Sequence, residues 1–242
     1  MSVGLPELAV GAWAFVAAFA SGLSGFAFGM VALGLWLHFL DPAVAGPLVV
    51  LCSLIGQLIT TVILHRSFRP DLFWPFILGG ALGIPLGVTI LKFAEPGPLK
   101  RGFGVFLVAY STYALLRRPM KPLLAGGRLA DGGIGMVGGV MGGTAGLSGV
   151  IPVLWCDLRG WGKEIGRGVY QPFNLTMHAL ALAGMMFAGL LTEKVWIAFA
   201  FCAPGIVLGT LAGLKLYARV DDRQFRIMLL CLVLASGVTL VV

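Results

Sequence analysis

Apolar runs of about 20 residues recur along the whole chain, and this repetition limits the possible folds more than any other feature. A helix of about 20 residues can cross the hydrocarbon core of a bilayer, which is about 30 Å thick. Hydrophobic residues make up 59% of the 242 residues and charged residues only 11%. The chain is therefore predicted to be an all-α polytopic membrane protein. The apolar segments lie at about residues 6–40, 43–64, 72–93, 99–116, 130–156, 168–191, 194–216 and 224–242.

Two of these segments are interrupted by glycine. Residues 132–152 read GGIGMVGGVMGGTAGLSGVIP and contain nine glycines, and residues 21–29 read SGLSGFAFG. Each glycine costs about 1 kcal/mol relative to alanine inside a helix, so a robust helix is not expected there. As one helix, the first segment would also be about 52 Å long, which exceeds the bilayer core. We therefore expect two half-helices in each segment, with the backbone close to another backbone or to a ligand.

The basic residues distinguish two topologies, because cytoplasmic loops of membrane proteins are enriched in Lys and Arg. If all eight segments cross the membrane, ten basic residues lie on one side and seven on the other. If the two interrupted segments are re-entrant hairpins, thirteen lie on one side, and only Lys92, Lys100, Arg101 and Lys194 lie on the other. The second arrangement is favoured. It has six full spans and two hairpins, with both termini on the periplasmic side of the inner membrane, and eight plain spans are the alternative.

The two halves of the chain resemble each other. Gly83-Ile-Pro-Leu-Gly87 corresponds to Gly205-Ile-Val-Leu-Gly209, and the glycine motifs match at an offset of either 124 or 117 residues. Each half would hold a hairpin and three spans, so the second half would be inverted relative to the first, as in secondary transporters. The predicted organisation is a first transmembrane repeat at 1–118, a cytoplasmic linker at 119–128 and a second repeat at 129–242.

Polar side chains at membrane depth are costly and therefore mark candidate functional residues. Gln171, Asn174 and His178 are spaced by three and four residues, so they share one helix face, and Ser53 and Gln57 share a face of another helix. Converging at the membrane midplane, the two faces would bind a polar substrate; hydrogen bonding between helices is the alternative. The candidate substrate-binding residues are Ser24, Gly25, Ser53, Gln57, Gly143, Thr144, Ser148, Gln171, Asn174 and His178.

The two breaks add a feature that suits an anion. A half-helix that begins at membrane depth directs unpaired N–H groups and the positive end of its dipole toward the site. Ser24, Thr144 and Ser148 lie at the breaks, where they are expected either to cap the half-helices or to donate hydroxyl groups to an oxyanion. His178 is the candidate for proton coupling, because it is the one ionisable side chain deep in a predicted span; a structural histidine is the alternative.

Other features exclude some classes of function. The net charge of +7 resides in short loops, where it sets topology, so no nucleic-acid partner is expected. The four cysteines lack the spacing of a metal site, and neither a metal nor a cofactor is expected. The first ten residues lack a basic n-region, so a cleaved signal peptide is not expected. Lys163 and Arg167 are expected at the cytoplasmic mouth of the sixth segment, as topology determinants or attractants for anions. Four tryptophans near segment ends are expected to anchor the protein at the membrane interface: Trp36, Trp74, Trp155 and Trp196.

The spaced glycines Gly139, Gly142 and Gly146, followed by an apolar run that ends in Pro152, resemble the pattern of the TauE/SafE family of sulfite and organosulfonate transporters. The resemblance covers nearly the whole chain. The first half departs from the pattern, because Leu35 and its neighbours stand where the proline is expected. The resemblance implies transport of small sulfur-containing anions across the inner membrane, often outward, with no enzymatic activity. Its expected partners are the anion and the lipid bilayer, and homo-oligomer formation is left open.

Two other classes of function are alternatives. Gly-x-Ser-Gly is also the nucleophile motif of rhomboid intramembrane proteases, in which Ser148 and His178 would be the nucleophile and the base. Against this, the motif occurs twice, and its first copy has no corresponding histidine. A channel for another small solute is the remaining alternative.

Overall fold

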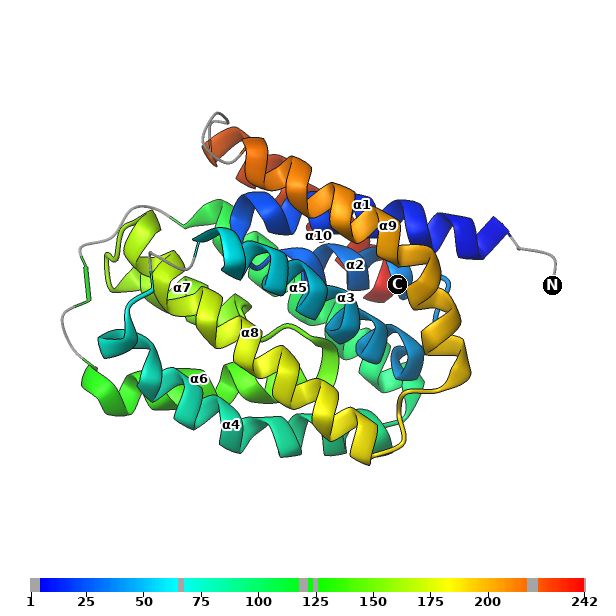
Figure 1. Cartoon of the computed structure of the whole chain (residues 1–242), viewed down its shortest axis with the longest axis horizontal. Helices are drawn as coiled ribbons and strands as arrows, with labels where there is room; N and C mark the ends of the chain where they lie inside the picture. The colour runs from blue at the N-terminus through cyan, green and yellow to red at the C-terminus, as the bar shows by residue number, and fades with distance from the viewer. Residues whose placement is uncertain (1–4, 65–67, 118–121, 124–125, 217–221, 242) are drawn as a thin grey trace.

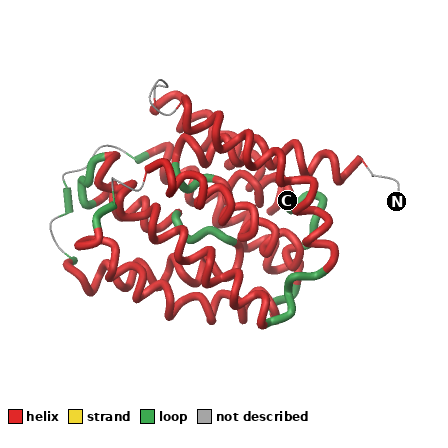
Figure 2. Tube along the Cα trace, viewed as in Figure 1, coloured by secondary structure: helices red, strands yellow, loops and turns green. Residues whose placement is uncertain are grey.

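The computed structural model describes residues 5–64, 68–117, 122–123, 126–216 and 222–241. Within these residues the chain is all-helical, as predicted, and contains no strand (Figures 1 and 2). The helices are α1 (Leu5–Ser24), α2 (Phe28–Trp36), α3 (Pro42–Leu64), α4 (Pro70–Phe93), α5 (Pro96–Leu116), α6 (Gly127–Ala145), α7 (Val150–Leu158), α8 (Lys163–Phe187), α9 (Glu193–Leu216) and α10 (Asp222–Val241).

Both glycine-interrupted segments are broken, as predicted. The first consists of α1 and α2, and the second of α6 and α7. At each break a glycine adopts the left-handed conformation, Gly25 with φ of 87° and Gly146 with φ of 68°. A residue with a β-carbon is strained in this conformation, whereas glycine adopts it freely, so these two glycines end α1 and α6.

The glycine-rich stretch itself is helical up to Ala145, which corrects the expectation that it could not form a robust helix. The reason is helix packing. α6 lies against α4, and α1 lies against α9, so closely that a β-carbon at most of the contacting glycines would meet main-chain atoms of the other helix. Such approach is typical of small-residue interfaces in membranes, where packing stabilises the glycines. The contacting glycines are Gly79, Gly83 and Gly87 of α4, Gly135, Gly139 and Gly143 of α6, Gly11 and Gly22 of α1, and Gly205, Gly209 and Gly213 of α9.

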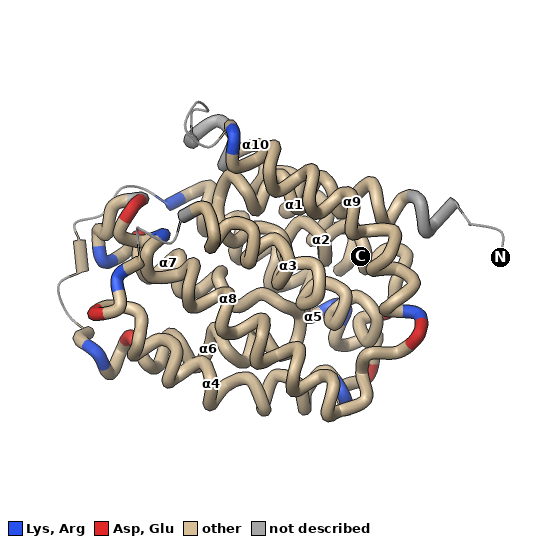
Figure 3. The backbone as a smooth tube through the Cα atoms, in the orientation of Figure 1, with Lys and Arg blue, Asp and Glu red and all other residues tan. Residues whose placement is uncertain are grey.

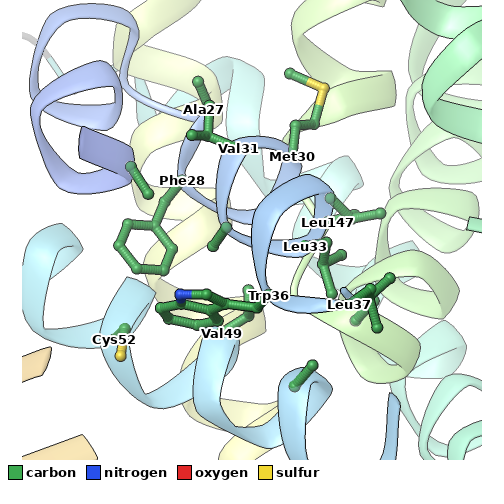
Figure 4. Packing of buried hydrophobic residues seen from close by; sticks show 14 of the residues in the cluster. Ala27, Phe28, Met30, Val31, Leu33, Trp36, Leu37, Val49, Cys52 and Leu147 are labelled. Carbon is green, nitrogen blue, oxygen red and sulfur yellow. The ribbon is translucent and has the colours of Figure 1, made fainter. Parts of the chain in front are cut away.

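Each broken segment folds back on itself, and a tryptophan joins its two ends. The indole N–H of Trp36 in α2 donates to the Val10 carbonyl of α1 at 3.3 Å, and that of Trp155 in α7 donates to Asp131 of α6 at 2.7 Å. Trp36 is completely buried, so the prediction that it anchors the protein at the membrane interface is wrong. Its ring lies in the core among residues of α2, α3 and the second break, including Phe28, Val49, Cys52 and Leu147 (Figure 4).

The outer surface of the bundle is apolar. On α4, every fourth residue from Leu78 to Ile90 is exposed and hydrophobic, with Leu82 71% exposed. The Lys, Arg, Asp and Glu residues of the described chain lie mainly toward the two ends of the molecule (Figure 3). A continuous apolar stripe of this kind fits contact with lipid. Among the described helices, three are long and apolar enough to cross a membrane: Pro42–Ile63, Pro70–Phe93 and Glu193–Leu216. Shorter apolar helices are Ala9–Ser24 and Ile227–Val241.

The helix pairs that pack together follow a reciprocal scheme. α4 packs on α6 and α1 on α9; α3 packs on α9 and α8 on α4; α3 packs on α8 and α5 on α10. α1 begins at the right-hand end of the view in Figure 1, whereas α6 begins at the left-hand end. The two hairpins therefore reach the centre of the bundle from opposite ends.

Candidate functional site

The predicted polar face of α8 exists and is longer than predicted. Arg167, Gln171, Asn174 and His178 follow one another at steps of four, three and four residues, which places them along one side of the helix. All four side chains are buried, with at most 3% of each exposed. They face the two helix breaks, so one side of α8 lies against both points at which the hairpins change direction.

At the first break, side chains of α3 and α8 donate hydrogen bonds to the carbonyl groups at the end of α1. Arg167 donates from its Nη2 to the Gly22 carbonyl at 3.1 Å and from its Nη1 to the Leu23 carbonyl at 3.5 Å. The Tyr170 hydroxyl donates to the Ser24 carbonyl at 3.1 Å, and Gln57 donates to the Gly25 carbonyl at 3.1 Å. The last carbonyls of a helix accept no hydrogen bond within the helix, so these contacts satisfy them inside the bundle.

The two predicted polar faces meet at this break. Gln171 of α8 donates through its Nε2 to the Oε1 of Gln57 in α3. The Gln57 and Gln171 faces therefore meet at the first break, and substrate binding by them stays a prediction. Ser53 lies one turn before Gln57, and its buried hydroxyl has no hydrogen-bond partner.

At the second break, His178 and Asn174 hold the turn between α6 and α7. The Nε2 of His178 lies 3.2 Å from the Gly146 carbonyl oxygen, and its Nδ1 lies 2.6 Å from the Asn174 carbonyl oxygen. The Ser148 hydroxyl donates to the Oδ1 of Asn174 at 3.1 Å. The Nδ2 of Asn174 is buried and has no hydrogen-bond partner. It lies beside Gly149, the residue that precedes α7, because a β-carbon at Gly149 would be 2.6 Å from it.

The two breaks are built alike, and their corresponding residues are separated by one offset in the sequence. Gln57 binds the carbonyl of Gly25, and His178 lies against the carbonyl of Gly146. Residues 25 and 146, like residues 57 and 178, are 121 positions apart, so neither 117 nor 124 superposes the breaks. Ser148 therefore follows its break, whereas Ser24 precedes its own.

The breaks also touch each other. A β-carbon at Gly29, in the first turn of α2, would lie 2.8 Å from the Gly146 carbonyl oxygen, and one at Gly149 would lie 2.9 Å from Phe26. α2 and α7 thus begin next to each other inside the bundle. The N-terminus of a helix carries a partial positive charge, so two such ends meet at this point.

The remaining candidates have local roles. The Ser24 hydroxyl donates to the Ala20 carbonyl at 2.8 Å and accepts from the Ala27 N–H at 3.1 Å, so it holds the turn before α2. The Thr144 hydroxyl donates to carbonyls of its own helix, those of Val140 and Met141. Gly143 packs against the backbone of α4, where a β-carbon would lie 2.6 Å from the Ile84 carbonyl oxygen.

The side chain of Arg167 points into the bundle. It was expected at the cytoplasmic mouth, but its guanidinium group reaches inward to the end of α1. Its spacing of four residues from Gln171 was the signal that could have added it to the polar face. Tyr170 lies beside that face, and its hydroxyl also binds the first break.

A cleft of about 440 Å³ reaches the second break from the turn between α4 and α5. Its walls are mainly apolar, and Thr144 and Leu147 lie at the end of α6 and in the break itself. The remaining lining residues are Ala94, Pro98, Leu99, Gly102, Phe103, Phe106 and Met141.

Comparison with known proteins adds one finding. The sequence model of a family described as sulfite exporter TauE/SafE matches residues 10–240. A search of curated proteins gave no match. A search of solved structures gave none either.

Proposed function

The chain belongs to the TauE/SafE sulfite exporter family, and we propose that it is a secondary transporter that moves small sulfur-containing anions across the cytoplasmic membrane by alternating access. The family is one of membrane transporters, and the apolar outer surface fits a protein in the bilayer. Export, as the family description states, is the proposed direction.

One observation carries the proposal: a buried, unpartnered amide donor lies at the start of a half-helix within the bundle. The Nδ2 of Asn174 has no hydrogen-bond partner and lies beside Gly149, at the N-terminus of α7. An unpaired buried donor costs free energy, whereas an oxyanion would accept from it and from the first N–H groups of α7. We place the substrate anion there, with Ser148 beside it.

The reciprocal packing supports two inverted repeats as the moving parts. Exchanging α1 to α5 with α6 to α10 turns the pair of α4 and α6 into α9 and α1, and the pair of α4 and α8 into α9 and α3. The pairs of α3 with α8 and of α5 with α10 are exchanged with themselves. This is the relation of a two-fold axis, and rocking of one repeat against the other would open the site alternately to each side.

His178 is the proposed proton-coupling residue. Both ring nitrogens face carbonyl oxygens, which only accept hydrogen bonds. A neutral imidazole has one N–H and can donate to one of them, whereas the protonated ring can donate to both. Protonation would therefore strengthen the contact between α8 and the second break, next to the proposed anion site.

The experiment measures substrate binding and flux in proteoliposomes. Asn174→Ala removes the unpartnered donor, and we expect the KM for a sulfonate or sulfite to rise about tenfold, the effect of one hydrogen bond to a charged ligand. Ser111→Ala is the matched control, because Ser111 is also buried and unpartnered but lies on α5. Unchanged binding and flux in Asn174→Ala would place the site elsewhere.

The geometry argues against the protease alternative, and a flux measurement separates a transporter from a channel. The Ser148 hydroxyl donates to Asn174, and both ring nitrogens of His178 face main-chain carbonyls, so the two residues do not form the bonded pair that a serine protease requires. A channel would conduct without saturation. Saturable uptake that depends on a gradient therefore separates a carrier from a pore.

A further inference from the structure

We propose that the first break is a second anion site, in which Arg167 supplies the positive charge and selects for doubly charged anions. The inference rests on the proposed transport of anions through this bundle. It adds a site at the first break, whereas Asn174 lies at the second. Three side chains form it: Arg167 and Gln171 of α8, and Gln57 of α3.

The burial of Arg167 is the first argument. A long basic side chain near the end of a membrane helix normally extends toward the interface, where its charge is hydrated. Arg167 is the fifth residue of α8, yet it is only 3% exposed and reaches the Gly22 and Leu23 carbonyls at the end of α1. A basic residue that only determined topology would not need this inward position.

The second argument is the convergence of α8 side chains on Gly25. A β-carbon at this glycine would lie 2.9 Å from the Tyr170 ring, 3.3 Å from the Oε1 of Gln171 and 3.4 Å from the Nε of Arg167. Side chains of α8 therefore converge on a position that has no side chain of its own. These side chains point to the break, where α1 ends and the chain turns toward α2.

Hydrogen-bond chemistry indicates how an anion would be held. The guanidinium group has five N–H donors, and a fully charged oxyanion accepts from them more strongly than a carbonyl, which carries only a partial charge. The Gln171 amide has its Nε2 on Gln57, while its buried Oε1 has no hydrogen-bond partner. Rotation of this amide would turn its N–H₂ group toward an anion beside Arg167, at the cost of the hydrogen bond to the Gln57 oxygen.

The two sites are arranged in series along α8. Arg167 and His178 are eleven residues apart, which corresponds to about 16 Å along a helix. An anion coming from the end at which α8 begins reaches the charged site first and the Asn174 site second. A positive charge at the first site attracts a dianion more strongly than a monoanion, because the Coulomb energy scales with the product of the charges.

The test compares a dianion with a monoanion of similar chemistry. In proteoliposomes, Arg167→Gln is expected to raise the KM for thiosulfate about 30-fold and that for methanesulfonate about fivefold, so that the ratio of the two changes. Arg167→Lys keeps the charge and should restore most of the preference for the dianion. Arg117→Gln is the control, because Arg117 pairs with Asp157 at the end of α5 and should leave the ratio unchanged.

The outcomes separate this inference from the proposed function. A wild-type protein that transports neither anion refutes both. If the wild type transports both anions and Arg167→Gln leaves the ratio of their two KM values unchanged, only the second site is refuted. A purely structural role would affect both anions equally. If Arg167→Gln does not fold, Gln57→Ala decides by the same measurement: a shift of the ratio against thiosulfate supports the site, and an unchanged ratio overturns it.

Discussion

Gln57 and His178 occupy corresponding positions at the two breaks but differ in chemistry. Each side chain meets the carbonyl of the left-handed glycine that ends a long helix. The glutamine amide donates this hydrogen bond at any pH, whereas the histidine ring gains a second donor when it binds a proton. A proton would therefore act on one break and leave the other unchanged.

This difference leads to a prediction for His178→Gln. The variant keeps an amide donor near the Gly146 carbonyl but cannot bind a proton, so anion exchange should persist while stimulation of flux by a pH gradient is lost. Flux into proteoliposomes with and without an imposed pH gradient measures the effect. His38→Gln is the control, because His38 is exposed and bonded to Thr239. Retention of gradient-stimulated flux by His178→Gln would exclude His178 as the coupling residue.

Glycines determine how closely the long helices approach. In α4, α6 and α9, the contacting glycines recur at every fourth residue, so they line one face of each helix. Each of these faces lies against the backbone of a helix from the other half of the chain. The interfaces between the halves thus depend on positions without a side chain.

A pair of substitutions in α6 tests this packing. A β-carbon at Gly139 would meet the Gly80 carbonyl of α4, whereas one at Gly133 would have no atom within 4 Å. We expect Gly139→Ala to destabilise the protein by about 1–3 kcal/mol through overpacking. Gly133→Ala should be neutral or stabilising by up to about 1 kcal/mol, since alanine favours a helix. Thermal unfolding in detergent measures both, and equal effects would refute the close-packing account.

At the scale of the whole molecule, the two hairpins reach the centre from opposite ends. Trp36 joins the end of α2 to the start of α1, and Trp155 joins the end of α7 to the start of α6. Because each break is formed inside the bundle, the N-termini of α2 and α7 lie among other helices. This arrangement would offer the proposed substrate anion two positive helix ends inside the bundle.

The proposed inverted arrangement predicts opposite locations for two loops. Gly162 precedes α8, and Lys194 lies at the start of α9; both are exposed. In cells, a membrane-impermeant maleimide should label a Lys194→Cys variant from outside and a Gly162→Cys variant only after permeabilisation. Both variants also carry Cys231→Ser, which removes the exposed native cysteine; the other three native cysteines are buried. Labelling of both positions from the same side would contradict the topology.

The sequence by itself determined the helical membrane class, the two broken segments and the polar face of α8. These follow from local rules: the length of apolar runs, the conformational freedom of Gly25 and Gly146, and a spacing of three and four residues. The family could also be identified, because its spaced glycines and Pro152 are local in the chain.

The tertiary structure decided what those residues contact. Gly135, Gly139 and Gly143 pack a continuous helix against another one, a role that depends on partners 59 residues away in the sequence, such as Gly80 for Gly139. Arg167, which was expected at the cytoplasmic mouth of the sixth segment, is buried, because the carbonyls that it binds belong to α1, 144 and 145 residues earlier. Only the packing of distant helices brings such groups together, so only the folded chain shows which polar atoms are satisfied and which, like Asn174 Nδ2, remain for a ligand.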